Sequence, residues 1–427
     1  MVVVSLEQNS AIRREGDMGV TPRKNSITVE FDCQFRVVLE EGRLSSILSA
    51  FCKLLPVLLT DFIQKAVTGY GEYAMGLERK PFCCDQCGND REMIWKTRHG
   101  KETKILTIFK WVTLHQLQVQ CSKCGHKMYV LRKLLGMEPM QRIPSETYRK
   151  LGLMGSLTSY RVAEKIVTLF GWAVDKMTVW KSVQKTGEEI EFQLDPQEEA
   201  SGEADGTGVP ISGIKKRGKE LKVLVQYKKG GGIRVAGVHI GNYNGGWEGL
   251  FKKSLEGLKG FKKFFLITDG DTSILDGLKG KVSLLLQRCL WHIPHQLKYM
   301  LWKDKVTRKG QEWLYVLSEV LEICAIRPLV DCEETIKAMI ASKKERLNKV
   351  IDYCRVRGYK TVVEYLENAK GDMFTAISNK LHGKTTSRVE RVFRTVNLRI
   401  NVGKWSAHGA LNVTKVRLAY YYNGFDV

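Results

Sequence analysis

The sequence predicts an α/β protein with a small metal-bound β domain, a helical pair and a larger α/β domain, in that order. Three observations carry this prediction. The motif Cys-x-x-Cys-Gly occurs twice between residues 81 and 130, the pattern changes from helical to strand-like near residue 204, and an apolar run at 263–268 ends in Asp269-Gly270-Asp271. An apolar run bounded by a Gly/Asp turn is typical of a buried strand, which would place Asp269 at the functional edge of a sheet.

Composition and charge narrow the class of protein. The chain has 427 residues, of which 43% are hydrophobic, so it is long enough for several packed domains and too apolar to be disordered. Its formal net charge is +22 and its pI is near 9.5. An excess of this size favours a polyanionic partner, usually nucleic acid, over a protein that is basic only for solubility.

No membrane or export segment is expected. The most apolar early stretch, residues 47–67, is interrupted by Lys53, Pro56, Asp61 and Lys65, and the N-terminus lacks the pattern of a signal peptide. Eleven cysteines without such a signal favour metal ligands and buried thiols over disulfides. We expect an intracellular protein, cytoplasmic and associated with the nucleoid if its source is prokaryotic.

Residues 1–80 are predicted to form an N-terminal arm and a helical region. Residues 1–30 are polar and without a clear period, which indicates a loose arm, whereas residues 41–75 have helical spacing of apolar side chains.

Residues 81–135 are predicted to form a zinc ribbon. Two thiolates from each Cys-x-x-Cys-Gly motif complete a tetrahedral site for Zn²⁺, and the strand-like run 103–120 between the motifs fits the ribbon. Cys83 and His126 are the competing ligands, but only Cys84 gives the two-residue spacing. The ligands are therefore Cys84, Cys87, Cys121 and Cys124.

Residues 145–190 have the pattern of a helix-turn-helix. A capped helix over 159–169 ends near Gly171, and residues 177–185 form a second helix of the recognition type. DNA binding is favoured over a plain helical hairpin because of the charge of the chain. The residues expected to face outward and reach DNA are Thr178, Lys181, Ser182 and Lys185.

The acidic, turn-rich stretch 186–203 is the predicted boundary of the α/β domain, residues 200–427. Strands at about 205–209, 221–227 and 233–240 are followed by a helix at 247–258, the strand at 263–269, a further strand at 282–290 and helices from Pro294 onward. The long helical stretch at about 300–380 is an insertion. This α/β order is also the order of the ribonuclease H-like fold.

Three isolated acids in this domain are candidate metal ligands. Asp205 and Asp269 lie on or at the end of predicted strands, and Glu390 lies in a basic segment near the end of the chain. Glu390 is the only acid between Asp372 and Asp426, and an exposed pair with Arg394 would be worth only a few tenths of a kcal/mol. Carboxylates from three elements can hold two Mg²⁺ or Mn²⁺ ions for phosphodiester chemistry. The segment 206–268 carries thirteen Lys and Arg residues and only three acids, a charge balance that suits a surface that attracts DNA phosphates.

Neighbouring residues leave alternatives open. Glu203 and Asp271 lie beside the proposed acids, but Asp205 precedes a Gly-Thr-Gly run that would let a phosphate approach, and Asp269 closes its strand directly. Cys289-x-x-His292 is half of a zinc site, a buried thiol beside a hydrogen-bonded histidine, or a place where His292 positions the scissile phosphate or the acids.

Together these motifs resemble the DDE transposases of the Mutator-like superfamily, which includes bacterial and archaeal insertion-sequence enzymes with an inserted helical domain. The resemblance covers about residues 200–427 and rests on Asp205, Asp269, Cys289-x-x-His292 and Ser387-x-x-Glu390-Arg391-x-x-Arg394. It implies a ribonuclease H-like core, catalysis by Asp205, Asp269 and Glu390 with help from His292, and DNA contacts from Arg388, Arg391 and Arg394.

The resemblance also implies the partners: double-stranded DNA at the element ends and at the target, and other copies of the chain assembled on that DNA. The expected reactions are cleavage of a mobile element's ends and their joining to the target. A nuclease with the same core and an inert DNA-binding regulator derived from a transposase are the alternatives.

Overall fold

The computed structural model describes residues 3–7, 34–38, 44–108, 110–169, 173–195, 199–213, 219–243, 245–255, 263–278, 280, 282–327, 332–381 and 383–425. By its internal contacts the chain divides into two units. One comprises residues up to Met154 together with Tyr160–Ser182, and the other comprises Gly155–Ser159 and the chain from Val183 onward. The division therefore falls inside a helix, slightly before the boundary predicted at 186–203.

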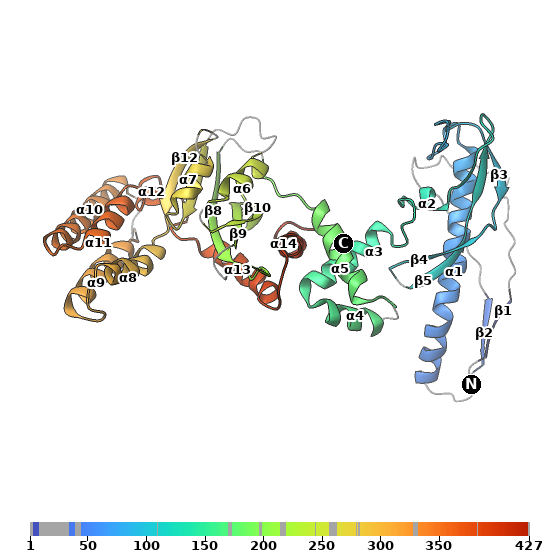
Figure 1. Cartoon of the computed structure of the whole chain (residues 1–427), viewed down its shortest axis with the longest axis horizontal. Coiled ribbons are helices and arrows are strands. Elements are labelled where there is room, and N and C mark those ends of the chain that lie inside the picture. The colour runs from blue at the N-terminus through green and yellow to red at the C-terminus, as the bar shows by residue number, and fades with distance from the viewer. Residues whose placement is uncertain are drawn as a thin grey trace. The chain divides into compact units, whose positions relative to one another are not determined.

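The first unit begins with a strand pair and one long helix. Strand β1 (Val3–Glu7) pairs antiparallel with β2 (Gln34–Val38), so the predicted loose arm is wrong for Val3–Glu7, and the rest of that arm lies outside the described residues. Helix α1 (Leu44–Gly76) confirms the helical region as a single helix (Figure 1). Among the helices that the structure describes, none is long and apolar enough to span a membrane.

Short strands follow α1. Strands β3 (Met93–Thr97), β6 (Gln118–Cys121) and β7 (Lys127–Tyr129) form an antiparallel sheet in the order β3-β6-β7, and β4 (Glu102–Leu106) pairs with β5 (Trp111–His115). Buried side chains of α1 and these strands share one core with Cys84 and Cys121. A small sheet thus surrounds the cysteine motifs, as the sequence predicts.

Four helices complete this part of the chain: α2 (Leu131–Leu134), α3 (Ser145–Leu157), α4 (Tyr160–Leu169) and α5 (Lys176–Glu189). Leu151 of α3, Val167 of α4 and Val179 of α5 share a buried cluster with Leu106 of β4. The two helices predicted between 159 and 185 are present as α4 and α5, and residues 170–172 between them lie outside the described residues.

The second unit is built on a five-stranded sheet in the order β10-β9-β8-β11-β12. The strands are β8 (Glu199–Gly208), β9 (Lys219–Tyr227), β10 (Ile233–Asn242), β11 (Lys263–Thr268) and β12 (Ser283–Arg288). The first three pair antiparallel, whereas β11 pairs parallel with both β8 and β12. All five predicted strands are present, and the α/β class is confirmed.

Helices cover both faces of this sheet. Helix α6 (Trp247–Ser254) and α7 (Thr272–Leu278) share a core with Ala204, Leu224 and Leu266. Successive strand residues point to opposite faces, so Glu203 and Asp205 of β8 face the other way. That face is covered by α12 (Thr375–Ser378) and α13 (Ser387–Ile400), while α14 (Ala407–Tyr422) packs on β10.

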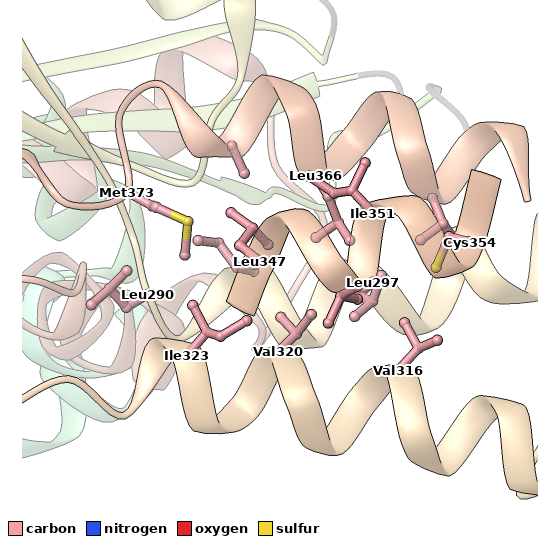
Figure 2. Close-up of a cluster of buried hydrophobic side chains, with 14 of the residues drawn as sticks. Leu290, Leu297, Val316, Val320, Ile323, Leu347, Ile351, Cys354, Leu366 and Met373 are labelled. Atoms are coloured by element: carbon pink, nitrogen blue, oxygen red, sulfur yellow. The ribbon is translucent and has the colours of Figure 1, made fainter. Parts of the chain in front are cut away.

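The helical insertion follows β12. The helical stretch predicted from Pro294 onward is present as four helices: α8 (His292–Lys303), α9 (Gln311–Cys324), α10 (Glu333–Val356) and α11 (Lys360–Lys370). Figure 2 shows their side chains meeting in one core, with Leu297, Val316, Val320, Leu347, Ile351 and Leu366 turned inward. The insertion therefore has its own hydrophobic centre beside the sheet.

Candidate active site and metal centres

Asp205 and Asp269 come from neighbouring parallel strands. β11 pairs with β8 in a register that places Ile267 opposite Glu203; Asp205 lies two residues further along β8, and Asp269 follows the last residue of β11 and lies near enough for its charge to act on Asp205. Asp205 is only 8% exposed, and its Oδ1 accepts a hydrogen bond of 2.7 Å from the backbone N–H of Gly206. The carboxyl end of β11 therefore delivers Asp269 to the edge where Asp205 is already buried.

Cys289 and His292 lie at the same edge, just after β12. The backbone N–H of Cys289 donates to the Thr268 carbonyl at 2.7 Å, which extends the parallel pairing past the end of the strand. The Thr386 hydroxyl lies 3.4 Å from the Cys289 Sγ and 3.3 Å from the His292 Nδ1. Cys289 is thus a buried thiol in a hydrogen-bond network and belongs to neither metal-ligand group among the described residues.

Glu390 reaches this edge from the first turn of α13. Its Oε1 lies 3.9 Å from the His292 Nε2, and the side chains are 44% and 12% exposed, respectively. Within the described part of the chain no ion pair joins Glu390 to Arg394, so the alternative of a simple i,i+4 pair does not account for this acid.

One ligand atom from each of Asp205, His292 and Glu390 lies within 4.8 Å of the other two, so this group could hold a metal ion. Two atoms that each lie ~2.2 Å from one ion are at most about 4.4 Å apart, and the group is close to that geometry. Asp269 is not a member of this tight group, although its charge acts on Asp205. The predicted triad is therefore brought together in part, with His292 as the third close member.

The electrostatics of the group reflect this crowding. Burial, and then the neighbouring charge of Asp269, hold the pKa of Asp205 well above its usual range. Burial by itself lowers the pKa of His292, but the adjacent Cys289 thiol and the charges of Asp205 and Asp269 raise it to about 9. Because a metal ligand must be unprotonated, a cation bound here would compete with the proton on His292.

Glu203 is not a free ligand but a cap for the helix that carries Glu390. Its carboxylate is 1% exposed and accepts from the backbone N–H groups of Arg388 at 2.9 Å and Val389 at 2.8 Å, and from the Tyr227 hydroxyl at 2.6 Å. Helix N-termini leave such N–H groups unpaired, and a residue at the N-cap usually satisfies them. The residue at that position, Thr386, makes no cap bond because its hydroxyl is directed to Cys289 and His292.

Asp271 is likewise occupied. Its Oδ1 accepts from the Ser273 backbone N–H at 2.9 Å and from the Ser273 hydroxyl at 2.7 Å, and its Oδ2 accepts from the Trp247 indole at 3.3 Å. It anchors the start of α7. Asp269 accepts only one hydrogen bond among the described residues, from the Asp271 backbone N–H to its Oδ1 at 3.0 Å, so its Oδ2 is left for a ligand.

The absence of a side chain at Gly206 matters on the face of the sheet opposite to Asp205. A Cβ at this position would lie 2.3 Å from the Cδ of Glu220, which occupies the face of the sheet opposite to Asp205. The small size of Gly206 accommodates the Glu220 carboxylate, which pairs with the buried Lys222 at 2.6 Å.

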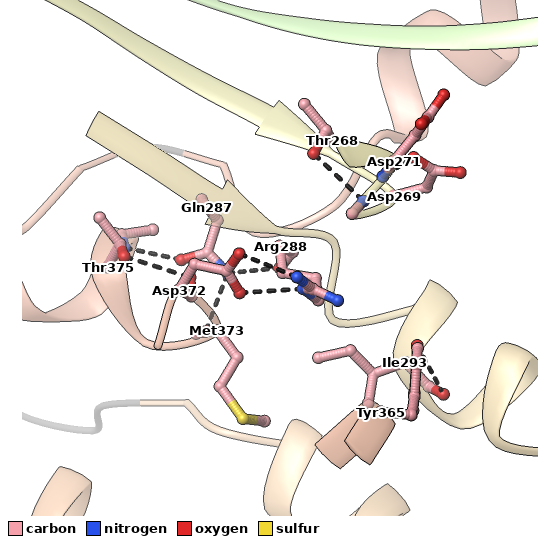
Figure 3. A network of polar contacts seen from close by, with 12 residues as sticks. Thr268, Asp269, Asp271, Gln287, Arg288, Ile293, Tyr365, Asp372, Met373 and Thr375 are labelled. Atoms are coloured by element: carbon pink, nitrogen blue, oxygen red, sulfur yellow. Dashed lines mark hydrogen bonds and ion pairs between the residues drawn. The ribbon is translucent and has the colours of Figure 1, made fainter. Parts of the chain in front are cut away.

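Figure 3 shows how the insertion is attached beside this edge. Arg288, at the end of β12, donates to both carboxylate oxygens of Asp372 at 2.9 and 3.2 Å. The Gln287 amide donates to the Met373 carbonyl at 2.8 Å and accepts from the Ala376 N–H at 2.7 Å. A Cβ on Gly270 would lie 2.7 Å from the Arg288 Nη1, so this guanidinium also packs under the turn that carries Asp269.

The predicted DNA-contacting residues differ in exposure. Arg391 and Arg394 are exposed on α13, and Lys181 and Lys185 are exposed on α5. Arg388 is exposed but its guanidinium stacks 4.7 Å from the centre of the Tyr227 ring and donates to the Gly232 carbonyl.

Two positions on α5 have other roles. Thr178 is half-buried and its hydroxyl donates to the Asp175 carboxylate. The expectation for Ser182 is wrong: it is 3% exposed, and its hydroxyl donates to the Thr178 carbonyl at 2.8 Å.

The four predicted cysteines form a second candidate metal centre. The sulfurs of Cys84, Cys87, Cys121 and Cys124 all lie within 4.8 Å of one another, with Cys84 3.6 Å from Cys124 and Cys87 3.7 Å from Cys121. The Asn89 amide donates to the Cys121 Sγ at 3.4 Å, which outweighs burial and lowers the pKa of that thiol to about 6. This cluster could hold a metal ion, and Cys83 is not part of it.

No family model matches the sequence, and no curated protein matches it at a significant level. The sequence predicts Asp205, His292 and Glu390 as site residues but does not predict that Glu203 caps α13. Glu203 lies two residues before Asp205, and this spacing indicates that both side chains lie on the same face of the strand.

Proposed function

We propose that this protein is a metal-dependent DNA transposase of the DDE type, with a ribonuclease H-like core. The convergence of Asp205, His292 and Glu390 beside Asp269 is the observation that carries the proposal. The topology supports it: three antiparallel strands, two parallel strands and a helical insertion before the helix of the last acid follow the order expected for that fold.

The donor set suits a hard divalent cation. Carboxylate oxygens fit Mg²⁺ or Mn²⁺, and the imidazole of His292 in the same group favours Mn²⁺ of the two. When bound, such ions activate the attacking oxygen and stabilise the leaving oxygen of a phosphodiester. Asp205 and Glu390 would bind the ion with His292, and Asp269 would complete a second set of ligands with the shared Asp205.

The remaining residues of the site hold these ligands in place. Glu203 fixes the start of α13 against β8 and so sets the distance from Glu390 to Asp205. Thr386 fixes His292 through Nδ1, which leaves Nε2 turned to Glu390. Placement of this kind matters because a misplacement of about 1 Å can cost 10²-fold in rate.

For the four-cysteine cluster we propose Zn²⁺. Four thiolates at ~2.3 Å from a tetrahedral ion lie about 3.8 Å apart, and two of the sulfur pairs are already 3.6 and 3.7 Å apart. Such a site stabilises a small β domain. We further propose that α4 and α5 form the helix-turn-helix and that Lys181 and Lys185 contact DNA phosphates.

The test is a cleavage and joining assay on DNA fragments that flank the reading frame, with Mg²⁺ or Mn²⁺. The variants are Asp205→Asn, Asp269→Asn and Glu390→Gln, and the matched control is Asp276→Asn, an exposed acid on α7. We expect the three site variants to bind DNA but to lose cleavage and joining, while the control retains both.

Each other outcome points elsewhere. Cleavage without joining by the unmodified protein would indicate a nuclease, and DNA binding without any cleavage would indicate a regulator. Full activity of Asp205→Asn would refute the proposed site. Inverted repeats around the reading frame would support the proposal independently.

A further inference from the structure

The outward face of α8 carries a row of aromatic rings. Trp291, Tyr299 and Trp302 are 59%, 53% and 70% exposed, and His295 and Lys298 between them are also exposed. The opposite face supplies the core of the insertion through Ile293, Leu297 and Leu301, all fully buried. The exposed rings therefore contribute nothing to the packing of the insertion.

Helical geometry places these residues on one side of α8. Trp291 already has helical backbone angles, and residues 291, 295, 298, 299 and 302 fall within an arc of about 100° at ~100° per residue. The rings follow each other: Trp291 stacks on His295 with centroids 5.3 Å apart, and His295 lies 6.0 Å from Tyr299. The row extends roughly 16 Å along the helix.

The row begins at the candidate active site. The Trp291 ring contacts the His292 ring edge-on, with centroids 5.0 Å apart, and His292 belongs to the metal-ligand group with Asp205 and Glu390. A strand whose phosphate lies at that group would therefore have its adjacent nucleotides within reach of Trp291.

We propose that this aromatic row, formed by Trp291, His295, Tyr299 and Trp302, binds unpaired bases of the DNA strand that is cut. The inference rests on the proposed function and extends it to the form of the substrate. Aromatic rings bind bases of any sequence by stacking, and cations beside them attract the backbone. Lys298 lies within the row and Lys303 follows it, so the face matches both the bases and the charge of a nucleic acid strand.

This row fits bases better than it fits a protein partner. Its large exposed side chains are all aromatic, whereas aliphatic side chains on α8 are directed into the core. Duplex DNA keeps its bases stacked on each other, so the row can act only on bases that have left the duplex. The protein is thus expected to prefer ends that are frayed or that carry an unpaired segment.

The experiment measures binding of the full chain to two DNA probes without added divalent cation, so that no cleavage occurs. One probe is a blunt duplex, and the other has the same duplex with a short unpaired segment containing 2-aminopurine, whose fluorescence falls when it stacks. We expect the unmodified protein to bind the second probe more tightly and to quench it. Trp291→Ala should weaken that binding by about 5- to 150-fold and abolish quenching.

Two controls separate stacking from folding. Trp291→Phe keeps a ring and should restore most of the quenching, and Tyr243→Ala removes an exposed tyrosine outside α8 and should change nothing. Binding of the blunt duplex should be the same for all variants. Equal binding of the unpaired probe by the double variant Trp291→Ala/Tyr299→Ala and by the unmodified protein would overturn the inference, and so would an equal loss on both probes.

The failure of this inference differs from failure of the proposed function. If the protein cleaves DNA and the aromatic variants bind the unpaired probe normally, only the stacking surface is refuted. If the unmodified protein binds neither probe, both proposals are overturned.

Discussion

Replacing Glu203 with alanine should displace helix α13 and with it Glu390. The substitution removes the acceptor for the N–H groups of Arg388 and Val389 and for the Tyr227 hydroxyl, which now donate at 2.9, 2.8 and 2.6 Å. Each donor left unsatisfied at a buried site costs about 1–3 kcal/mol. With some relief from solvent entering the space, we expect a loss of roughly 3–5 kcal/mol in the free energy of unfolding of this domain.

Two measurements test this expectation. At about 2–4 °C per kcal/mol for a domain of 150–250 residues, the thermal midpoint should fall by roughly 6–20 °C. DNA cleavage measured well below the new midpoint should fall by at least about 10²-fold, because Glu390 no longer has a fixed position relative to Asp205. The second effect is the informative one, since loss of stability alone would leave the folded fraction active.

The conservative variant Glu203→Gln separates geometry from charge. A single Glu203 oxygen, Oε2, accepts both helix N–H groups, and a glutamine Oε1 can take its place while the amide nitrogen faces Tyr227. Burial raises the pKa of Glu203, and the three donors offset this only in part, so the negative charge is not the favoured feature of this site. Glu203→Gln should therefore retain most of the cleavage. Wild-type activity and stability of Glu203→Ala would refute the capping role.

Three further predictions concern neighbouring features. Gly270→Ala should reduce both stability and cleavage, because Gly270 has φ +97° and a Cβ there would lie 2.7 Å from the Arg288 guanidinium. Gly358 has φ +76° but open space around it, so Gly358→Ala should lower the free energy of unfolding, measured by thermal unfolding, only by the backbone strain of roughly 1–2 kcal/mol. Asp372→Asn should cost about 3 kcal/mol by breaking a buried pair with Arg288, whereas Asp352→Asn in the exposed pair with Arg355 should cost less than about 1 kcal/mol. Cys121→Ser should abolish metal binding at the cysteine cluster, as measured by the metal content of the purified protein, whereas Cys83→Ser should leave it unchanged; equal content in both variants would refute the site.

The parts of the fold that depend on short-range patterns could be predicted from the sequence. The spacing within Cys-x-x-Cys-Gly restricts both thiols to one turn, and the apolar run at 263–268 has few conformations open to it other than a buried strand. One break within the helical insertion is also marked locally in the sequence. Gly358 follows α10 with a positive φ of +76°, as is common just after a helix end.

For Ser182 the helix was predicted correctly, but the side of the helix on which the residue lies was not. It lies three residues after Val179 and one before Val183, and both valines are fully buried, so it belongs to the inward stripe of α5. The prediction placed it outward together with Thr178, Lys181 and Lys185. Its hydroxyl is satisfied by the Thr178 carbonyl four residues earlier, which lets a serine occupy a buried stripe.

The cap on α13 could not be predicted in this way, because it joins residues far apart in the chain. Glu203 and Val389 are separated by 186 positions, and nothing near either residue marks the contact. Thr386 is a residue type that favours the N-cap, so local rules assign the capping role to the wrong side chain. Only the fold shows that its hydroxyl is directed to Cys289 and His292.

The attachment of the insertion explains how Glu390 lies beside His292 and Asp205, which precede it by 98 and 185 positions. The insertion begins at His292 and returns to the sheet at Asp372, where Arg288 and Gln287 of β12 bind the returning chain. The two ends of the insertion are therefore fixed at the same strand end, and Thr386 and Glu203 fix the start of α13 a few residues later. Changes within α9 to α11 can then alter the insertion without moving Glu390, whereas loss of Arg288 or Glu203 acts on the site directly.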